Sequence, residues 1–376
     1  MTAPAHSTTF EKAIHVTPID TNTYSAHLDP SWCIGHVPHG GYTASVLYRT
    51  ATTHFVQKAA RAGASKTRGH KQQPPQEPIG LQITFQRRTF AGPAILSVQE
   101  IKLGARVSTI HVTLSQARDE RAAAAAAATG TALKSSDRND LEVKVLAYVS
   151  LSPPAAEEGP AVTAPWDLAP APPPGSLAGG AIDFKSLSEN GVDGEWKAGP
   201  VATPTLHAAK HVQAHSPAST LRPKTVEERA KQVVDQWSRF APGGVPARWS
   251  NEAVVYLADL FPAALDRLGA LEETAVLRAT GGNAKEGDGN KVATGEAPVQ
   301  FWYPTVTMNF DLKTRLPREG VEWLHTRVVT RMLRGSRADL EVLILDQDGG
   351  LVATSTQVAL VVDPARNGKG RGEGKL

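Results

Sequence analysis

The sequence contains a single cysteine, Cys33, among its 376 residues. One thiol excludes an intrachain disulfide framework and a zinc site built on several cysteines. Charge of one sign is also scarce: 40 Lys and Arg against 37 Asp and Glu leave a net charge of +3, which argues against a charge-driven nucleic-acid binder. No run approaches the roughly 18 consecutive apolar residues of a membrane helix, and MTAPAHSTTFEK is unlike a secretory signal. We therefore expect an intracellular, cytoplasmic protein with neither a membrane span nor a nucleic-acid partner.

Several common catalytic motifs are absent as well. The chain has no G-x-S-x-G elbow, no H-E-x-x-H and no Walker-type phosphate loop. We therefore expect no metal and no cofactor. The C-terminal GKL differs by one residue from the peroxisomal address SKL, so a peroxisomal location stays open as an alternative to the cytoplasm.

Proline and glycine concentrate in the middle of the chain, over residues 152–180, which disfavours a long helix or a central strand there. Hydrophobic residues at 41% and charged residues at 20% are typical of globular proteins, and the length suits two folding units. We predict an N-terminal domain over 1–151, a linker over 152–230 lying as extended chain on the surface, a C-terminal domain over 231–364 and a disordered tail over 365–376.

The two halves repeat the same order of elements. A short strand leads through a glycine-containing turn to one helix, expected over 42–59 in the first half and over 250–269 in the second. Long strand-like runs follow each helix, at 79–90, 94–103, 106–116 and 141–151, and then at 304–316, 321–333, 337–346 and 351–363. A strand, one helix and a run of antiparallel strands that curls around it describe the hotdog fold. We therefore predict an α+β tandem (double) hotdog with two antiparallel sheets, each wrapped around a central helix.

The histidines allow two special chemistries that the context does not favour. His207, His211 and His215 recur every four residues, a spacing that metals use on a helix, but they lie in the proline-bounded linker. His36 and His39 lie near Cys33, but no third group that would orient a catalytic imidazole is evident. We expect packed or solvated histidines and an inert thiol.

The turn before the first helix and one acid in the second helix are more informative. Gly40 and Gly41 allow a backbone or a carbonyl oxygen to approach the unpaired first-turn N–H groups, so an oxyanion hole is one reading and a tight helix entry is the other. Asp259 stands in the apolar VVYLADLFPAAL, where a carboxylate is costly to bury unless it is hydrogen-bonded or catalytic. The first helix has no matching carboxylate, so we expect one acid/base site per chain.

GHVPHGGYTASVLY, YLADLFP, FWYPTVTMNFDL and DGGLVATSTQVAL resemble the thioesterase-like double-hotdog family, whose best-known member is bacterial acyl-CoA thioesterase II. The resemblance covers most of 10–151 and 231–363 and is closer to divergent fungal members than to the bacterial enzyme. It is strongest in DGGLVATSTQ, which shares the D-G-x-L-V-A core and the glutamine. The resemblance implies an acyl-CoA thioesterase that acts on an acyl-CoA or a related thioester and serves lipid metabolism.

In that family an Asp, a Thr and a Gln jointly activate the water that attacks the thioester. The resemblance implies Asp259 as the base and Gln357 as a partner of the water. The threonine is Thr305 by the start of its strand or Thr307 by counting back from Pro317, and we prefer Thr305. Both have the same parity, so both can face one side of a strand. We place Gly40, Gly41, His39 and Thr307 on the oxyanion and substrate-binding side.

Three alternatives stay open. One is a non-hydrolytic hotdog protein that binds an acyl or polyketide-like ligand, or a biosynthetic cyclase or dehydratase; hotdog hydratases carry a His five residues after the Asp, where this chain has Ala264. Another is a scaffold whose linker prolines recruit partners. The third is a structural role for the polar residues.

The arginines at 87, 88, 331 and 334 are expected to be solvated or to meet CoA phosphates. Association of double hotdogs into homo-oligomers is left open.

Overall fold

The computed structural model describes residues 9–64, 75–118, 140–162, 168–172, 182–199, 206–218, 233–260, 301–363 and 365–368. The first half of the chain contains one long helix, and the other elements are strands and short helical turns. The elements are α1 (Phe10–Ala13), β1 (Val16–Pro18), β2 (Thr23–Leu28), η1 (Pro30–Trp32), β3 (Cys33–Ile34), β4 (Val37–Pro38), α2 (Gly40–Ala64), β5 (Glu77–Phe85), β6 (Gly92–Lys102), β7 (Ser108–Ala117), β8 (Leu141–Ser152) and η3 (Pro154–Ala156).

The second half repeats this composition with a shorter helix. Its elements are α4 (Phe184–Asn190), β9 (Val192–Asp193), β10 (Trp196–Ala198), η4 (Ala208–His211), β11 (Val212–Pro217), β12 (Val233–Phe240), η5 (Pro242–Gly244), α7 (Asn251–Leu257), β13 (Thr305–Leu312), β14 (Trp323–Val329), β15 (Leu333–Arg334), β16 (Arg337–Leu345), β17 (Leu351–Leu360) and α9 (Ala365–Gly368). None of the described helices is both long and apolar enough to cross a bilayer.

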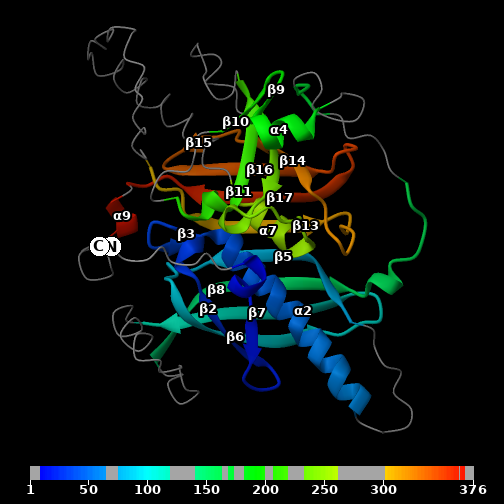
Figure 1. The fold of residues 1–376 in the computed structure, drawn as a ribbon. Helices are drawn as coiled ribbons and strands as arrows, with labels where there is room; N and C mark the ends of the chain where they lie inside the picture. The colour runs from blue at the N-terminus through cyan, green and yellow to red at the C-terminus, as the bar shows by residue number, and fades with distance from the viewer. Residues whose placement is uncertain are drawn as a thin grey trace.

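The strand order shows the duplication directly. The first half runs β2-β6-β7-β8-β5 and the second half runs β13-β17-β16-β14-β12, which is the same order of connections read from the opposite end. The two sheets join edge to edge where β5 pairs antiparallel with β13, with Asn309 opposite Gln82 (Figure 1). This pairing removes an exposed strand edge from each half. The predicted α+β double hotdog is confirmed.

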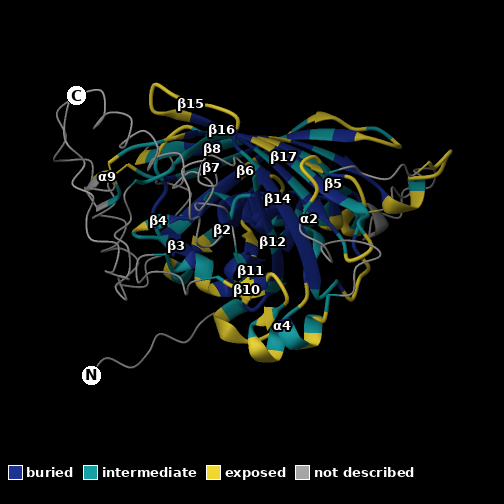
Figure 2. Cartoon of the chain, turned by 90° about the horizontal axis from the view of Figure 1, so that it is seen from above, coloured by how far each residue is buried: buried dark blue, intermediate teal, exposed yellow. Residues whose placement is uncertain are grey.

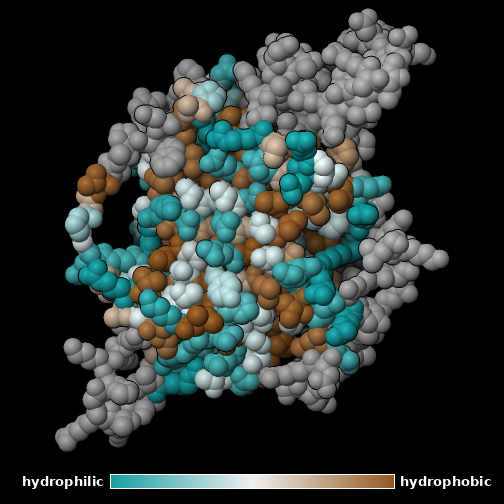
Figure 3. All heavy atoms as spheres, turned by 180° about the vertical axis from the view of Figure 1, so that it is seen from behind, coloured by the Kyte–Doolittle hydropathy of each residue, from teal (hydrophilic) through white to brown (hydrophobic). Residues whose placement is uncertain are grey.

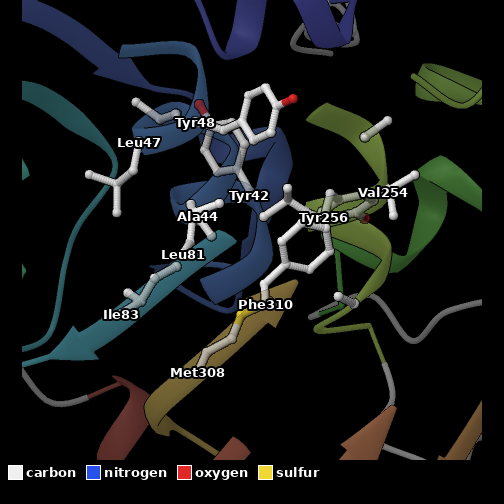
Figure 4. Packing of buried hydrophobic residues seen from close by; sticks show 14 of the residues in the cluster. Tyr42, Ala44, Leu47, Tyr48, Leu81, Ile83, Val254, Tyr256, Met308 and Phe310 are labelled. Carbon is white, nitrogen blue, oxygen red and sulfur yellow. The ribbon is translucent and has the colours of Figure 1, made fainter. Parts of the chain in front are cut away.

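The core lies where the two halves meet. Figure 4 shows Tyr42 and Leu47 of α2 and Tyr256 of α7 above Ile83 of β5 and Met308 of β13, and each of these side chains is at most 2% exposed. Ile83 lies directly opposite Met308 across the β5–β13 seam. In Figure 2 the strands in the middle of the molecule are buried, whereas exposed residues lie at its periphery. The central helices therefore seal the join between the two sheets from one side.

The face of the sheet away from the helices is mixed in character. Figure 3 shows hydrophilic and hydrophobic residues interspersed on the molecule seen from behind. Tyr148 of β8 is exposed, and its ring lies 4.8 Å from that of His111 on the neighbouring strand β7. The strands therefore alternate between a buried inner residue and a solvated outer one, as antiparallel sheets with one covered face do.

Three expectations about elements differ from the structure. The first is the disordered tail over 365–376, because its residues Ala365–Gly368 form α9, while 369–376 lie outside the described residues. Residues 184–199 and 206–217 are not extended surface chain: β9, β10 and β11 continue the sheet beyond β12, and α4 packs Leu187 against Trp196, Trp237 and Trp323. Trp196, together with Trp237 of β12 and Trp323 of β14, supplies the apolar area that the composition of the linker did not reveal. The domain boundaries themselves stay a prediction.

The second expected helix, 250–269, is shorter than its periodicity indicated. It ends at Leu257 and gives way to a turn, in which the Asp259 N–H is directed to the Tyr256 carbonyl. Pro262 lacks the N–H that would continue the helix, which is consistent with an early end. The residues from 261 onwards in this expected helix, Ala264 among them, lie outside the described residues, as does most of the alanine-rich insertion.

Candidate active site

Asp259 lies in the turn after α7 and faces the start of α2, so the site joins the two halves of the chain. Its Oδ2 accepts a hydrogen bond of 2.7 Å from the Gly41 N–H, and its Oδ1 accepts one of 3.0 Å from the Thr305 hydroxyl. The side chain is only 7% exposed. The positive end of the α2 dipole and these two donors together offset the free-energy cost of burying a carboxylate in apolar surroundings.

The two glycines at the start of α2 make this approach sterically possible. A Cβ at Gly40 would lie 2.5 Å from the Asp259 Oδ2, and a Cβ at Gly41 would lie 2.6 Å from the Tyr256 carbonyl oxygen. Any side chain larger than hydrogen would push the end of α7 away from α2. The expectation that these glycines allow another backbone to come close is thus met. The Gly41 N–H, however, donates to the Asp259 carboxylate, so it is not left unpaired for a substrate oxygen.

His39 precedes the glycines and completes the polar cluster. Its Nε2 lies 3.7 Å from the Asp259 Oδ2, and its Nδ1 has no hydrogen-bond partner among the described residues. Burial lowers the pKa of His39, and the neighbouring Asp259 carboxylate raises it by less. The imidazole is therefore neutral at neutral pH, and it packs edge-on against the Tyr256 ring at 5.3 Å.

The protonation of Asp259 follows from the same surroundings. Burial raises the pKa of Asp259 above that of an ordinary aspartate, while His39, the Thr305 hydroxyl and the Gly41 N–H oppose the shift. A carboxylate whose pKa is raised holds a proton more strongly, which makes it a better general base once it is ionised.

A bulge in β13 separates the two candidate threonines. Thr305 pairs with Ala359 and Thr307 pairs with Val358, so Val306 is an extra residue on this strand. Because neighbouring residues of β17 point to opposite faces, the bulge turns Thr305 towards Asp259 and Thr307 towards the outer face. Equal parity therefore does not give these threonines a common face. Thr307 is not among the residues that line the cavity described below.

Gln357 lies beside the same turn. Its Nε2 donates a hydrogen bond of 2.7 Å to the Ala258 carbonyl and makes a longer contact of 3.4 Å to the Ser355 hydroxyl. The side chain is buried at 4% exposure. The amide therefore holds the peptide that precedes Asp259, and it contacts the carboxylate only through that neighbour.

These residues open into a cavity of about 570 Å³. Asp259, Thr305, Gln357, His39 and Gly40 all contribute to its lining. Much of the remaining wall is apolar and comes from both halves. It includes Phe85, Leu206, Phe301, Trp302, Tyr303, Pro304, Leu340, Val342 and Ala359. The run of three aromatics before β13 is the sequence signal for this wall, because aromatic side chains carry a large apolar area that favours burial.

Cys33 and the spaced histidines do not join this site. Burial raises the pKa of the Cys33 thiol to about 12, so it is protonated and unreactive at neutral pH. His211 is stacked on Trp32, with Nε2 at 2.8 Å from the Ser31 carbonyl. His215 contacts the Leu187 carbonyl at 3.0 Å. Among the described residues no cluster of His, Cys, Asp or Glu is arranged to hold a metal ion.

The arginines considered for phosphate binding separate into two pairs. Arg87 and Arg88 lie on the cavity lining, and Arg87 pairs with Glu142 at 3.0 Å. Arg331 pairs with Glu341, and neither it nor Arg334 is a lining residue. Only the first pair is placed to meet a ligand that enters the cavity.

The first half carries no second copy of the polar cluster. An equivalent bulge interrupts the pairing of β5 with β8 at Pro78, the position that Thr305 occupies in β13. On the neighbouring strand β8, Val149 occupies the position that Gln357 has on β17 in the second half. A proline and a valine supply neither hydroxyl nor amide. The duplicated fold thus has one complete polar cluster in the part of the chain that the structure describes.

The chain matches two family models over most of its length. The acyl-CoA thioesterase N-terminal domain matches residues 28–133 and the acyl-CoA thioesterase C-terminal domain matches residues 185–361. The thioesterase-like protein TwmA of Talaromyces wortmannii is 31% identical over 375 residues, which is 98% of this chain and 97% of that protein.

Solved structures agree on the fold. A protein assigned as a thioesterase II from Thermobifida fusca superimposes with a TM-score of 0.59 at 19% identity, over 95% of this chain and 98% of that one. The acyl-CoA thioesterase II TesB2 of Mycobacterium marinum gives 0.52 at 15% identity, over 95% and 98%.

Proposed function

The chain belongs to the acyl-CoA thioesterase family, and on that premise we propose that it hydrolyses the thioester of an acyl-CoA with a water activated by Asp259, Thr305 and Gln357. The observation that carries the proposal is the buried Asp259 carboxylate, held from both sides and open to a largely apolar cavity. An acyl chain fits the apolar walls and its thioester reaches the polar cluster.

In the proposed reaction Asp259 takes a proton from the water as the water oxygen bonds to the thioester carbon. Thr305 donates to Oδ1 and fixes the plane of the carboxylate, so the base is already oriented when the substrate arrives. The Gln357 carbonyl accepts the second hydrogen of the water. The C–S bond then breaks, and the proton passes from Asp259 to the departing CoA thiolate. Atoms balance without a covalent enzyme intermediate.

The charge that develops on the thioester oxygen also needs a donor. Because the Gly41 N–H donates to Asp259, we assign the oxyanion to the preceding Gly40 N–H, which lies in the first turn of α2 and on the cavity lining. His39 is neutral and also lines the cavity, and we assign its ring N–H as a second donor to the oxyanion. Thr307, which the bulge turns away, takes no part.

Thiol release from a panel of acyl-CoAs, from acetyl to palmitoyl, tests the proposal. Hydrolysis of at least one chain length above the rate in buffer supports it. A wild-type protein that releases no thiol from any member contradicts it.

A second candidate is ligand binding without hydrolysis. It is favoured by one observation: the Gly41 N–H, a donor expected near the reacting carbonyl, already has a partner within the protein, the Asp259 carboxylate. A purified protein that carries a co-purified acyl or polyketide-like ligand, detected by mass spectrometry, and that releases no thiol would favour this candidate.

A further inference from the structure

Asn367, near the C-terminus, contacts the tip of the hairpin formed by β3 and β4. Its Nδ2 donates a hydrogen bond of 3.0 Å to the Ile34 carbonyl, and its Oδ1 accepts one of 3.2 Å from the His36 N–H. His36 and Asn367 are 331 positions apart in the chain. One side-chain amide thus satisfies backbone groups on both sides of the hairpin turn, as a neighbouring strand would.

Gly35, which lies between Ile34 and His36, has the backbone conformation and the lack of a side chain that this contact requires. Gly35 has φ +58°, and a Cβ built on it would lie 2.6 Å from the Asn367 Oδ1. A left-handed glycine both forms the turn and leaves room for the amide. Two hydrogen bonds and a glycine therefore describe a fitted contact between the C-terminal segment and the hairpin.

This contact stands at the catalytic cavity. Asn367, the hairpin residues from Ile34 to Pro38 and the following His39 and Gly40 all lie on the lining of the cavity. Figure 1 shows α9 beside β3, on the side of the molecule where α2 begins. His36 is exposed while Asn367 is half-buried, which places the contact at the mouth and away from Asp259.

We propose that Asn367 is a specificity-determining residue: its amide fastens α9 (Ala365–Gly368) to the β3–β4 hairpin and so completes one wall of the substrate cavity. The kinetic part of this inference rests on the proposed hydrolase function. With the amide in place the mouth is narrow and the acyl-CoA is enclosed. Without it the wall opens, and substrate is held less tightly although the polar cluster at Asp259 is intact.

Steady-state kinetics of Asn367→Ala test the wall. Two neutral hydrogen bonds change such an equilibrium by about 30-fold, so we expect KM for the preferred acyl-CoA to rise by about ten-fold or more, while kcat stays within about three-fold. Arg366→Ala, an exposed neighbour on the same turn that does not line the cavity, is the matched control and should leave both constants unchanged. An unchanged KM for Asn367→Ala, or an equal loss in both variants, overturns the proposal.

Glycine variants separate the contact from backbone strain. Gly35→Ala forces the amide away, whereas Gly335→Ala has nearly the same φ, +57°, with nothing within 4 Å of the new Cβ. We expect the rise in KM only for Gly35→Ala, and no further rise when it is combined with Asn367→Ala. Equal effects of the two glycine variants, or additive effects in the double variant, contradict the proposal.

Two measurements do not depend on hydrolysis. Amide hydrogen exchange over residues 33–38 should speed up by about ten-fold or more in Asn367→Ala and not in Arg366→Ala. If the wild type releases no thiol, the hydrolase function fails, and affinity for anilinonaphthalene sulfonate then tests the wall: weaker binding in Asn367→Ala alone supports it, and equal binding in all three proteins refutes it.

Discussion

Substitution of Gly41 by alanine separates helix propensity from the contact that builds the site. Alanine is favoured over glycine in a helix by about 1 kcal/mol, so propensity alone predicts a stabilised protein. The structure predicts the opposite, because the new Cβ would lie 2.6 Å from the Tyr256 carbonyl oxygen and 2.9 Å from the Asp259 Cβ. Overpacking of this kind costs about 1 to 3 kcal/mol. We expect a net destabilisation of about 1 kcal/mol.

The catalytic effect of Gly41→Ala should exceed its effect on stability. Displacing the end of α7 moves the Asp259 carboxylate away from the bound water, and a misplacement near 1 Å costs about a hundred-fold in kcat. Thermal unfolding and thiol release on one preparation measure both effects. Gly40→Ala is the companion variant: its Cβ meets the carboxylate Oδ2 and no backbone atom nearer than 3 Å, so kcat falls with a smaller change in Tm. A Gly41→Ala protein that is more stable than wild type and fully active would refute the reasoning.

Three further predictions concern single groups. Thr305→Val should lower kcat about ten-fold by removing the hydrogen bond to Asp259, while Thr307→Val, its control beyond the bulge, leaves kcat unchanged in the same assay. Because burial raises the pKa of Asp259, kcat/KM should fall on acidification with a midpoint above the pKa of an ordinary aspartate; a midpoint below it contradicts the assignment. His325 of β14 is fully buried, which lowers its pKa from 6.5 to about 4. The unfolded state therefore binds more protons between these values, and stability is lost as pH falls through them, by about 3 kcal/mol. His325→Leu should remove that part of the pH dependence in denaturant titrations, and an unchanged slope would count against it.

Much of the fold was predictable because the spacing of apolar residues along the sequence indicates which segments are strands and which are helices. The alternating runs after each helix and the single helix per half specify two curled sheets, and the structure has them. What the pattern concealed was the short α7, since the apolar spacing through Leu265 continues past the residue where the backbone leaves the helix. Strands β9 to β11 were missed because they are short, and because Trp196 of β10 is buried by Trp237 and Trp323, which lie on other strands far along the chain.

The candidate site was predictable in its members and less so in its geometry. An isolated carboxylate among apolar residues indicated Asp259. The pair Gly40 and Gly41 was predicted as an oxyanion hole or a tight helix entry, whereas in the structure the Gly41 N–H donates to Asp259. The choice between Thr305 and Thr307 depends on one extra residue in a strand, which no parity rule reveals. Asn367 gave no signal, because its partners are backbone atoms more than 300 positions away.

Thiol release by the Asp259→Asn protein is the most direct measurement of the central claim, which is that one buried carboxylate per chain activates the water. The amide keeps the size of the side chain and removes the base, and a general base contributes about 100- to 10,000-fold. We predict at most about 1% of the wild-type kcat with the fold intact by circular dichroism. Residual activity near the wild-type level would contradict the account. The first half could not supply such activity, because it has Pro78 where the second half has Thr305 and Val149 where the second half has Gln357.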